Sequence, residues 1–189
     1  LICYTHDELD LTDQVATKAM FKLERPEIVV LAAAKVGGIA ANDTFPSDFL
    51  YINLAIQNSV INAAVETGVQ TLLFLGSSCI YPRSCLQPIK EEYLLSGPLE
   101  ETNRAYAVAK IAGTELCWSA NKQHGFRYLA VMPTNMYGPH DNYHSTHSHV
   151  IPGLIRRIHE AKLNGDKKVS IWGTGEPRRE FLYSDDLAD

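Results

Sequence analysis

The feature that most constrains the fold is an alternation of short apolar runs with longer segments of helical spacing. The apolar runs are residues 27–34, 71–76, 128–132 and 169–172. Short runs without polar alternation are typical of strands buried on both faces of a parallel sheet. Apolar residues recur every three or four positions in residues 15–23, 47–67, 103–123 and 150–162. The sequence therefore predicts an α/β protein, a doubly wound parallel sheet with helices on both faces.

Several segments carry residues that begin or end helices. Asp10–Asp13 offers several capping residues, Asn103 has a side chain suited to the N-cap position, and Pro46 suits a first helical turn. Gly68 and Gly125 follow the last periodic residues of their segments, where glycine commonly ends a helix. These residues set the expected ends of the helices at residues 15–23, 47–67 and 103–123.

Composition narrows the class of protein. The chain has 189 residues and a net charge of −5, which argues against a nucleic-acid-binding protein because these usually carry a basic face. No apolar run reaches the length of a membrane-spanning helix. The four cysteines form no CxxC pair, which favours reduced thiols inside the cell, in the cytoplasm. We expect one domain, or one plus part of another, within a segment of a longer protein that is truncated at both ends.

Tyr106 and Lys110 form the sharpest chemical pattern. They stand at positions i and i+4 of a predicted helix, so both side chains project from one face. An ammonium close to a phenol favours the phenolate, and we therefore expect Lys110 to lower the pKa of Tyr106 into a range useful for acid/base catalysis. Ser77 ends a buried strand some residues earlier, where ligands of parallel sheets bind. Its hydroxyl is placed to hydrogen-bond a substrate oxygen beside the tyrosine.

A set of sequence blocks resembles the GDP-L-fucose synthase family of extended short-chain dehydrogenases/reductases. The Ser-Ser-Cys-Ile-Tyr-Pro and Ser-His-Val-Ile-Pro blocks are more specific than the Tyr/Lys pair, and the resemblance extends over the whole chain. The blocks are Leu31–Ile39, Leu75–Pro82, Tyr106–Gly113, Met132–Pro139, Ser148–Pro152 and Arg179–Leu182. The resemblance implies a Rossmann-type fold and NADP(H)-dependent conversion of GDP-4-keto-6-deoxy-D-mannose to GDP-L-fucose, by 3,5-epimerisation and then reduction of the 4-ketone.

The resemblance also implies roles for individual residues. Cys79 is the base and His149 the acid of epimerisation, while Tyr106 donates a proton to the C4 oxygen. The implied catalytic set is Ser77, Cys79, Tyr106, Lys110 and His149. The implied cofactor-binding set is Leu75, Gly76, Ser77, Ser78, Lys110, Pro133, Thr134, Asn135, Met136 and His149. The implied substrate-binding set is Arg157, Trp172 and Arg179.

Other interpretations of these residues remain open. A nucleotide-sugar 4-epimerase of the same fold keeps the Ser/Tyr/Lys set but needs no Cys/His pair. A non-catalytic dinucleotide-binding protein typically loses the Tyr or the Lys. Cys79 also suits a small buried apolar site, which is the usual environment of a free cysteine. The four histidines at positions 140, 144, 147 and 149 lack the spacing of a known metal site, so we expect no metal.

The glycine-rich phosphate loop of dinucleotide-binding proteins is absent from the sequence. We therefore expect residues 1–189 to form a dinucleotide-binding domain without its first βα phosphate loop, with part of a substrate-binding region at about 150–189. Tyr4–Asp7 would follow the second strand, where the adenosine ribose is read, and His6 stands where family members can carry Arg. NADP is favoured by the resemblance. In related reductases, helices corresponding to about 47–67 and 103–123 pair in a homodimer.

Overall fold

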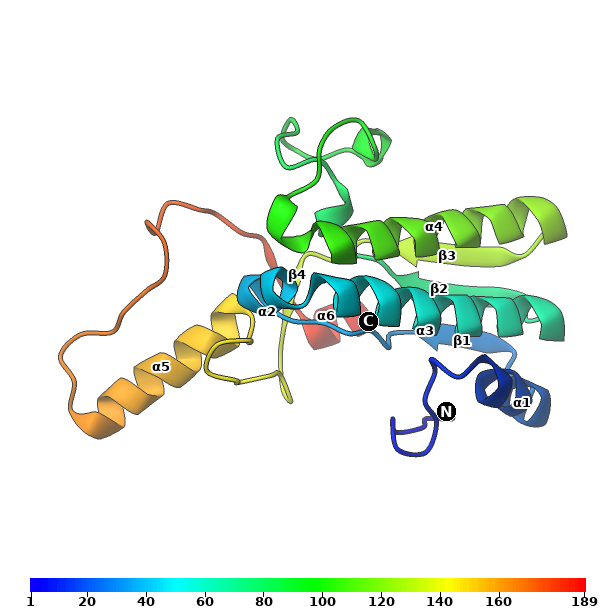
Figure 1. The fold of residues 1–189 in the computed structure, drawn as a ribbon, viewed down its shortest axis with the longest axis horizontal. Helices are drawn as coiled ribbons and strands as arrows, with labels where there is room; N and C mark the ends of the chain where they lie inside the picture. Colours follow the sequence, from blue (N-terminus) through cyan, green and yellow to red (C-terminus); the bar gives the residue numbers. More distant parts are fainter. The chain divides into compact units, whose positions relative to one another are not determined.

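The computed structural model describes residues 1–189. The chain forms two compact units, one of residues 1–36 with 45–132 and one of residues 37–44 with 133–189. Both are drawn in Figure 1.

The first unit is built on a three-stranded parallel sheet in the order β1-β2-β3. The strands are β1 (Ile28–Leu31), β2 (Thr71–Leu75) and β3 (Arg127–Val131). Leu31 pairs with Phe74, and Phe74 pairs with Ala130. This pairing confirms the expected parallel sheet. Because the strands are parallel, their carboxyl ends lie at one edge of the sheet.

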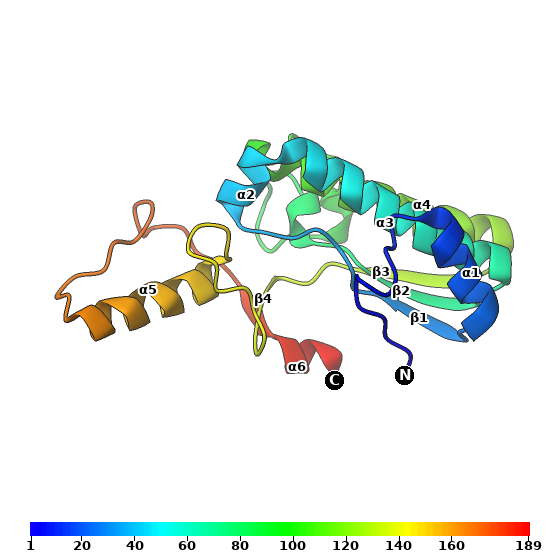
Figure 2. The ribbon, with the colours of Figure 1, turned by 60° about the horizontal axis from the view of Figure 1, so that its bottom comes forward.

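Three helices cover one face of this sheet (Figure 2): α1 (Gln14–Glu24), α3 (Pro46–Thr67) and α4 (Arg104–His124). The side chains of Phe21, Leu72 and Phe74 are buried between these helices and the sheet. The alternate residues of the strands point the other way, and Ile28 and Leu129 are 66% and 60% exposed. Helices were expected on both faces, but within these residues they cover one.

The helix ends follow local chemistry. The Asp13 carboxylate accepts hydrogen bonds from the backbone N–H groups of Val15 and Ala16 and so begins α1. Gly68 ends α3 with φ of 77°, a left-handed conformation that glycine adopts without steric cost. Asn103 occupies the N-cap position of α4 as expected, but its side chain makes no capping hydrogen bond.

A long connection joins β2 to α4. It contains three short 3₁₀ helices, η1 (Ser78–Ile80), η2 (Glu91–Tyr93) and η3 (Glu101–Asn103). Two residues separate the end of β2 from the first of these, which lies at the carboxyl edge of the sheet.

The second unit contains α2 (Ile39–Thr44), β4 (Asn135–Tyr137), α5 (Val150–Asn164), β5 (Phe181–Tyr183) and α6 (Ser184–Ala188). Strands β4 and β5 pair in parallel, with Met136 opposite Leu182. The strand predicted at residues 169–172 is wrong. These residues pair with no strand, and Ile171 and Trp172 are 65% and 62% exposed, so their apolar character does not reflect burial.

None of the helices in the chain combines the length and the apolar character needed to span a membrane.

Candidate functional site

Reactive side chains of the first unit meet where β2 ends and α4 begins. Ser77 and Cys79 follow β2 directly, while Tyr106 and Lys110 lie in the first two turns of α4. The i, i+4 spacing places Tyr106 and Lys110 on one helix face, and the Lys110 ammonium lies 5.7 Å from the Tyr106 ring centroid. The structure therefore brings together four of the five residues of the expected catalytic set.

Lys110 is a buried cation, with 4% of its surface exposed. Its ammonium donates a 2.7 Å hydrogen bond to the carbonyl oxygen of Leu75, the last residue of β2. It forms no ion pair with a carboxylate, and burial lowers its pKa to about 8. The hydrogen bond to Leu75 uses one of three N–H donors, so two remain for a ligand at the carboxyl edge of the sheet.

The environment of Tyr106 contradicts one expectation. Burial raises the pKa of its phenol, and the charge of Cys79 adds to this effect. The predicted lowering by Lys110 is wrong in this structure, because desolvation of the phenolate outweighs any attraction to the ammonium. The Tyr106 hydroxyl is consequently protonated at neutral pH and available as a proton donor. Its ring packs edge-on against Phe49, with centroids 6.3 Å apart.

Cys79 lies in η1, partly exposed and next to Ser77. The backbone N–H of Cys79 donates to the Ser77 hydroxyl oxygen at 3.4 Å. Burial raises the pKa of the thiol, while a hydrogen bond with Ser77 and the positive charge of Lys110 act in the opposite direction. The pKa of the thiol is raised overall, because burial outweighs the attraction that the Lys110 ammonium exerts on a thiolate.

The turn after β2 approaches β3 closely. The backbone N–H of Gly76 donates to the carbonyl oxygen of Val131 at 2.8 Å. A Cβ atom at Gly76 would lie 3.0 Å from this oxygen, so a side chain here would push the two strand ends apart. Leu75, Gly76, Ser77 and Ser78, four of the expected cofactor-binding residues, therefore form the segment that leaves the sheet beside Lys110.

Two buried polar residues of α3 hold this site and were missed from the sequence. The Asn53 amide accepts from the backbone N–H of Lys35 at 2.9 Å and donates to its carbonyl oxygen at 3.0 Å. The Gln57 amide donates to the carbonyl oxygen of Ala109 at 2.8 Å, next to Lys110. Both lie in register with the buried Phe49, at i+4 and i+8. The sequence signal that could have identified them is a polar side chain at a position where the helical spacing predicts an apolar one.

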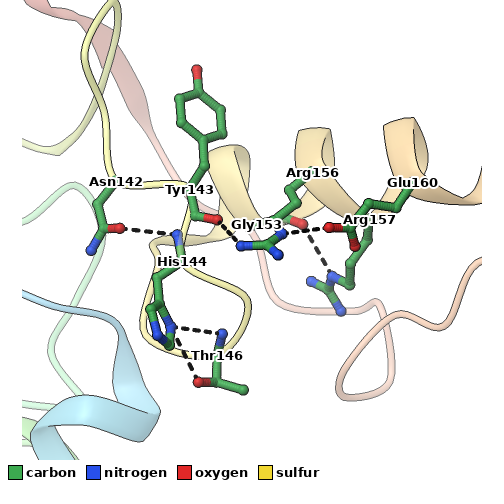
Figure 3. A network of polar contacts seen from close by, with 8 residues as sticks. All are labelled: Asn142, Tyr143, His144, Thr146, Gly153, Arg156, Arg157 and Glu160. Carbon is green, nitrogen blue, oxygen red and sulfur yellow. Dashed lines mark hydrogen bonds and ion pairs between the residues drawn. The ribbon is translucent and has the colours of Figure 1, made fainter.

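The second unit contains the remaining predicted residues, and Figure 3 shows part of it. His149 is exposed and occupies the N-cap position of α5 without a capping side-chain bond. The Arg157 guanidinium lies 5.2 Å from the Trp172 ring centroid and donates to the Gly153 and Ser170 carbonyl oxygens. Two of the three expected substrate-binding residues are thus in contact. Arg179 donates to the carbonyl oxygen of the neighbouring Arg178.

Residues 133–136 follow β3 and enter β4. The backbone N–H and side-chain amide of Asn135 both donate to the Glu180 carbonyl oxygen, which fixes the start of the β4–β5 pair. In the histidine-rich loop, the rings of His144 and His147 stack at 4.6 Å, and His144 Nδ1 accepts from the backbone N–H of Thr146 (Figure 3). No group of three or more His, Cys, Asp or Glu residues is arranged to hold a metal ion.

Comparison with known proteins identifies the family and the fold of the chain. The sequence model of the NAD dependent epimerase/dehydratase family matches residues 4–189. The chain belongs to this family. It is 57% identical over its full length to GDP-L-fucose synthase 1 of Arabidopsis thaliana. It spans 58% of the length of that relative.

Solved structures of the family resemble the chain throughout. A GDP-D-glycero-L-gluco-heptose synthase from Campylobacter jejuni, solved in the presence of NADPH, has a TM-score of 0.93 at 40% identity, covering 100% of this chain and 64% of that one. A GDP-L-fucose synthetase from Naegleria fowleri bound to NADP has a TM-score of 0.89 at 35% identity, covering 99% and 61%. The Rossmann-type fold expected from the sequence is confirmed.

Proposed function

We propose that the complete protein is an NADPH-dependent GDP-L-fucose synthase, which converts GDP-4-keto-6-deoxy-D-mannose by 3,5-epimerisation and then reduces the 4-ketone. The observation that carries the proposal is the juxtaposition of Cys79 with Ser77, Tyr106 and Lys110 at the carboxyl edge of β2. Sequence identity of 57% to the Arabidopsis synthase supports the same reaction. We also infer that the reaction takes place in the cytoplasm, because all four cysteines are free thiols.

The donor set fits a dinucleotide. Lys110 is a buried ammonium with two unused N–H donors, suited to the hydroxyl groups of a nicotinamide ribose. The segment of residues 75–78 lies beside it. We infer that Pro133, Thr134, Asn135, Met136 and His149 complete the binding surface. The bound cofactor would supply the hydride for C4.

The epimerisation depends on acidity next to a ketone. A hydrogen atom on C3 or C5 is removable only if the negative charge that develops on the C4 oxygen is stabilised. The protonated Tyr106 hydroxyl and the Ser77 hydroxyl both donate hydrogen bonds suited to that oxygen. Cys79 removes the proton as a thiolate, and the positive charge of Lys110 offsets part of the rise that burial causes in the pKa of the thiol. We assign His149 as the acid that returns a proton on the opposite face.

The reduction uses the same groups in a second role. As hydride reaches C4, negative charge again develops on its oxygen, and Tyr106 gives up its proton to it. Burial raises the pKa of the tyrosine, so it carries this proton at neutral pH. Lys110 then lies close to the resulting phenolate and stabilises it. The roles of Cys79 and Tyr106 are separable, since the thiol is needed for epimerisation alone.

The second unit is proposed to bind the GDP part of the substrate. Arg157 and Arg179 carry guanidinium groups that match a diphosphate, and Trp172 offers an exposed ring. We therefore interpret residues 1–189 as a dinucleotide-binding domain that includes, at about 150–189, part of the substrate-binding region.

We also propose a homodimer formed by the outer faces of α3 and α4. Large apolar side chains are exposed there: Tyr51 at 71%, Val108 at 40% and Trp118 at 46%. Burying apolar surface of this kind between two copies is favourable, and a four-helix arrangement uses both helices from each. Light scattering of the complete protein with Trp118→Glu tests this: a wild-type dimer and a monomeric variant are expected.

The proposed reaction is tested by separating its two stages. In D₂O without NADPH, the complete protein should exchange deuterium into C3 and C5 of GDP-4-keto-6-deoxymannose, as followed by NMR. With NADPH, absorbance at 340 nm should fall and GDP-L-fucose should form. Cys79→Ser should lose the exchange and yield reduced sugars without inversion, whereas Cys85→Ser, the matched control at another partly exposed thiol, should retain both stages.

Each alternative has its own outcome in this assay. No NADPH consumption by the wild-type protein would sink the synthase proposal and favour a 4-epimerase. Unchanged deuterium exchange in Cys79→Ser would remove Cys79 as the base.

A further inference from the structure

The Lys110 ammonium lies against a second aromatic ring, which the proposed reaction does not use. The Phe74 ring centroid is 4.7 Å from Lys110 Nζ, closer than the Tyr106 ring at 5.7 Å. Phe74 is 1% exposed and belongs to β2, one residue before the carbonyl that accepts the ammonium's hydrogen bond. The strand therefore offers both a ring face and a carbonyl oxygen to one buried cation.

The position of the Phe74 ring depends on a missing side chain in α4. A Cβ atom at Gly113 would lie 2.5 Å from Phe74 Cζ and 2.8 Å from Gln57 Oε1. Gly113 is one turn beyond Lys110, in a helix interior where glycine is normally unfavourable relative to alanine by about 1 kcal/mol. The glycine thus leaves the space that the ring fills.

Two hydrogen bonds hold the helix backbone around this space. The Gln57 amide donates to the carbonyl oxygen of Ala109, and the Thr114 hydroxyl donates to that of Lys110. Lys110 is consequently fixed from the strand, from α3 and from its own helix. The titratable groups that face it are Tyr106 and Cys79, and no carboxylate pairs with it.

We propose that Phe74 is a positioning residue for Lys110, whose ring face keeps the buried ammonium charged and directed at the carboxyl edge of β2. A cation over an aromatic face is attracted by the ring quadrupole, and this attraction strengthens when both groups are desolvated. This attraction replaces part of the solvation that the ammonium loses on burial. A carboxylate could do the same, but it would neutralise the positive charge. The role of Phe74 in holding the ammonium is independent of the proposed function, and only its effect on catalysis rests on that function.

The charge of Lys110 is sensitive to such a contact. Burial lowers its pKa to about 8, so near neutral pH a small further decrease changes the charged fraction. A lysine with its ordinary pKa of 10.5 would remain charged throughout this range.

The test weakens the ring quadrupole while nearly preserving the ring's shape. Phe74 in the complete protein is replaced site-specifically by 4-fluoro-, 3,5-difluoro- and 3,4,5-trifluorophenylalanine. Phe21 receives the same series as the matched control, because it is equally buried, at 1% exposure, but contacts no cation. Lysine labelled with ¹³C at Cε reports the titration of Lys110 by NMR, and Lys110→Arg identifies its resonance.

With increasing fluorination at Phe74, the pKa of Lys110 should fall stepwise, by about half a pH unit to one pH unit in total. The series at Phe21 should leave it unchanged. Identical titrations in the two series would overturn the proposal. Gly113→Ala, which displaces the ring, should lower the same pKa although alanine favours the helix, and an unchanged value would contradict the assigned space.

The catalytic consequence is read from the pH dependence of kcat for ketone reduction. Its alkaline limb should move down with the NMR titration in the Phe74 series, with KM for the sugar nearly constant. A limb that stays in place while the titration moves would overturn the catalytic part. If the wild-type protein reduces no ketone, the proposed function fails, whereas the NMR comparison still decides the role of Phe74.

Discussion

The side-chain amide of Asn53 supports the chain where it leaves β1. Its oxygen accepts from the backbone N–H of Lys35, and its nitrogen donates to the carbonyl oxygens of Lys35 and Phe49, at 3.0 Å and 2.7 Å. In Asn53→Ala, the Phe49 oxygen keeps its partner within α3, while both backbone groups of Lys35 lose theirs. An unpaired buried group costs about 1 to 3 kcal/mol, and half-buried Lys35 belongs at the lower end.

We therefore expect Asn53→Ala to lower the free energy of unfolding by about 2 kcal/mol relative to a matched variant. The control is Asn58→Ala, at an exposed position of the same helix, which gains the same helix propensity and loses no such contacts. Urea denaturation of the complete protein measures both. Hydrogen exchange offers a local readout, and the Lys35 amide should exchange about 30-fold faster in Asn53→Ala.

The result that refutes this reasoning is equal stability of the two variants. Faster exchange throughout the sheet, with no excess at Lys35, would also contradict it. In that case Asn53 would contribute to general packing, and the loop after β1 would be held by other contacts.

Three further changes test separate features of the structure. Lys110→Met should abolish ketone reduction yet raise the free energy of unfolding near pH 7. The folded-state pKa of Lys110, about 8, lies below the ordinary 10.5, so between these pH values the unfolded wild-type protein binds more protons than the folded one. The stability advantage of the variant should therefore shrink as the pH rises from about 8 to 10.5, and a constant difference in denaturation experiments across this range would contradict the argument. Asp13→Ala should lower stability by about 1 kcal/mol through loss of two capping bonds, measured by denaturation against Asp43→Ala, an exposed aspartate without a side-chain hydrogen bond. Gly68→Ala should lower stability by about 1 kcal/mol, because φ is 77° while no atom lies within 4 Å of the added Cβ; an unchanged melting temperature would show that the backbone relaxes there.

The sequence was sufficient for the parts of the fold that depend on local periodicity. The long helices α3 and α4 and the three parallel strands lie close to their predicted ranges, because apolar spacing and glycine ends are local signals. The strand predicted at residues 169–172 failed because a run of apolar residues does not say whether a partner strand is available. Conversely, β4 and β5 have three residues each and carry too little periodicity to be recognised.

The candidate site divides in the same way. Tyr106, Lys110, Ser77 and Cys79 were predicted because they belong to compact motifs. Asn53, Gln57 and Phe74 were missed, since their contacts join residues 18, 52 and 36 positions apart in the chain. The pKa of Tyr106 was predicted in the wrong direction because burial, which decides it, depends on tertiary packing.

Helix α3 contacts the loop after β1 and the backbone of α4 through side chains one turn apart. Asn53 holds the residue after β1, and Gln57 holds the backbone next to Lys110. Four residues of helix span about 6 Å and behave as a stiff strut. A tilt or slide of α3, which lies beside α4 in Figure 1, would therefore displace both regions together, so the loop after β1 and the proposed site on α4 are mechanically coupled.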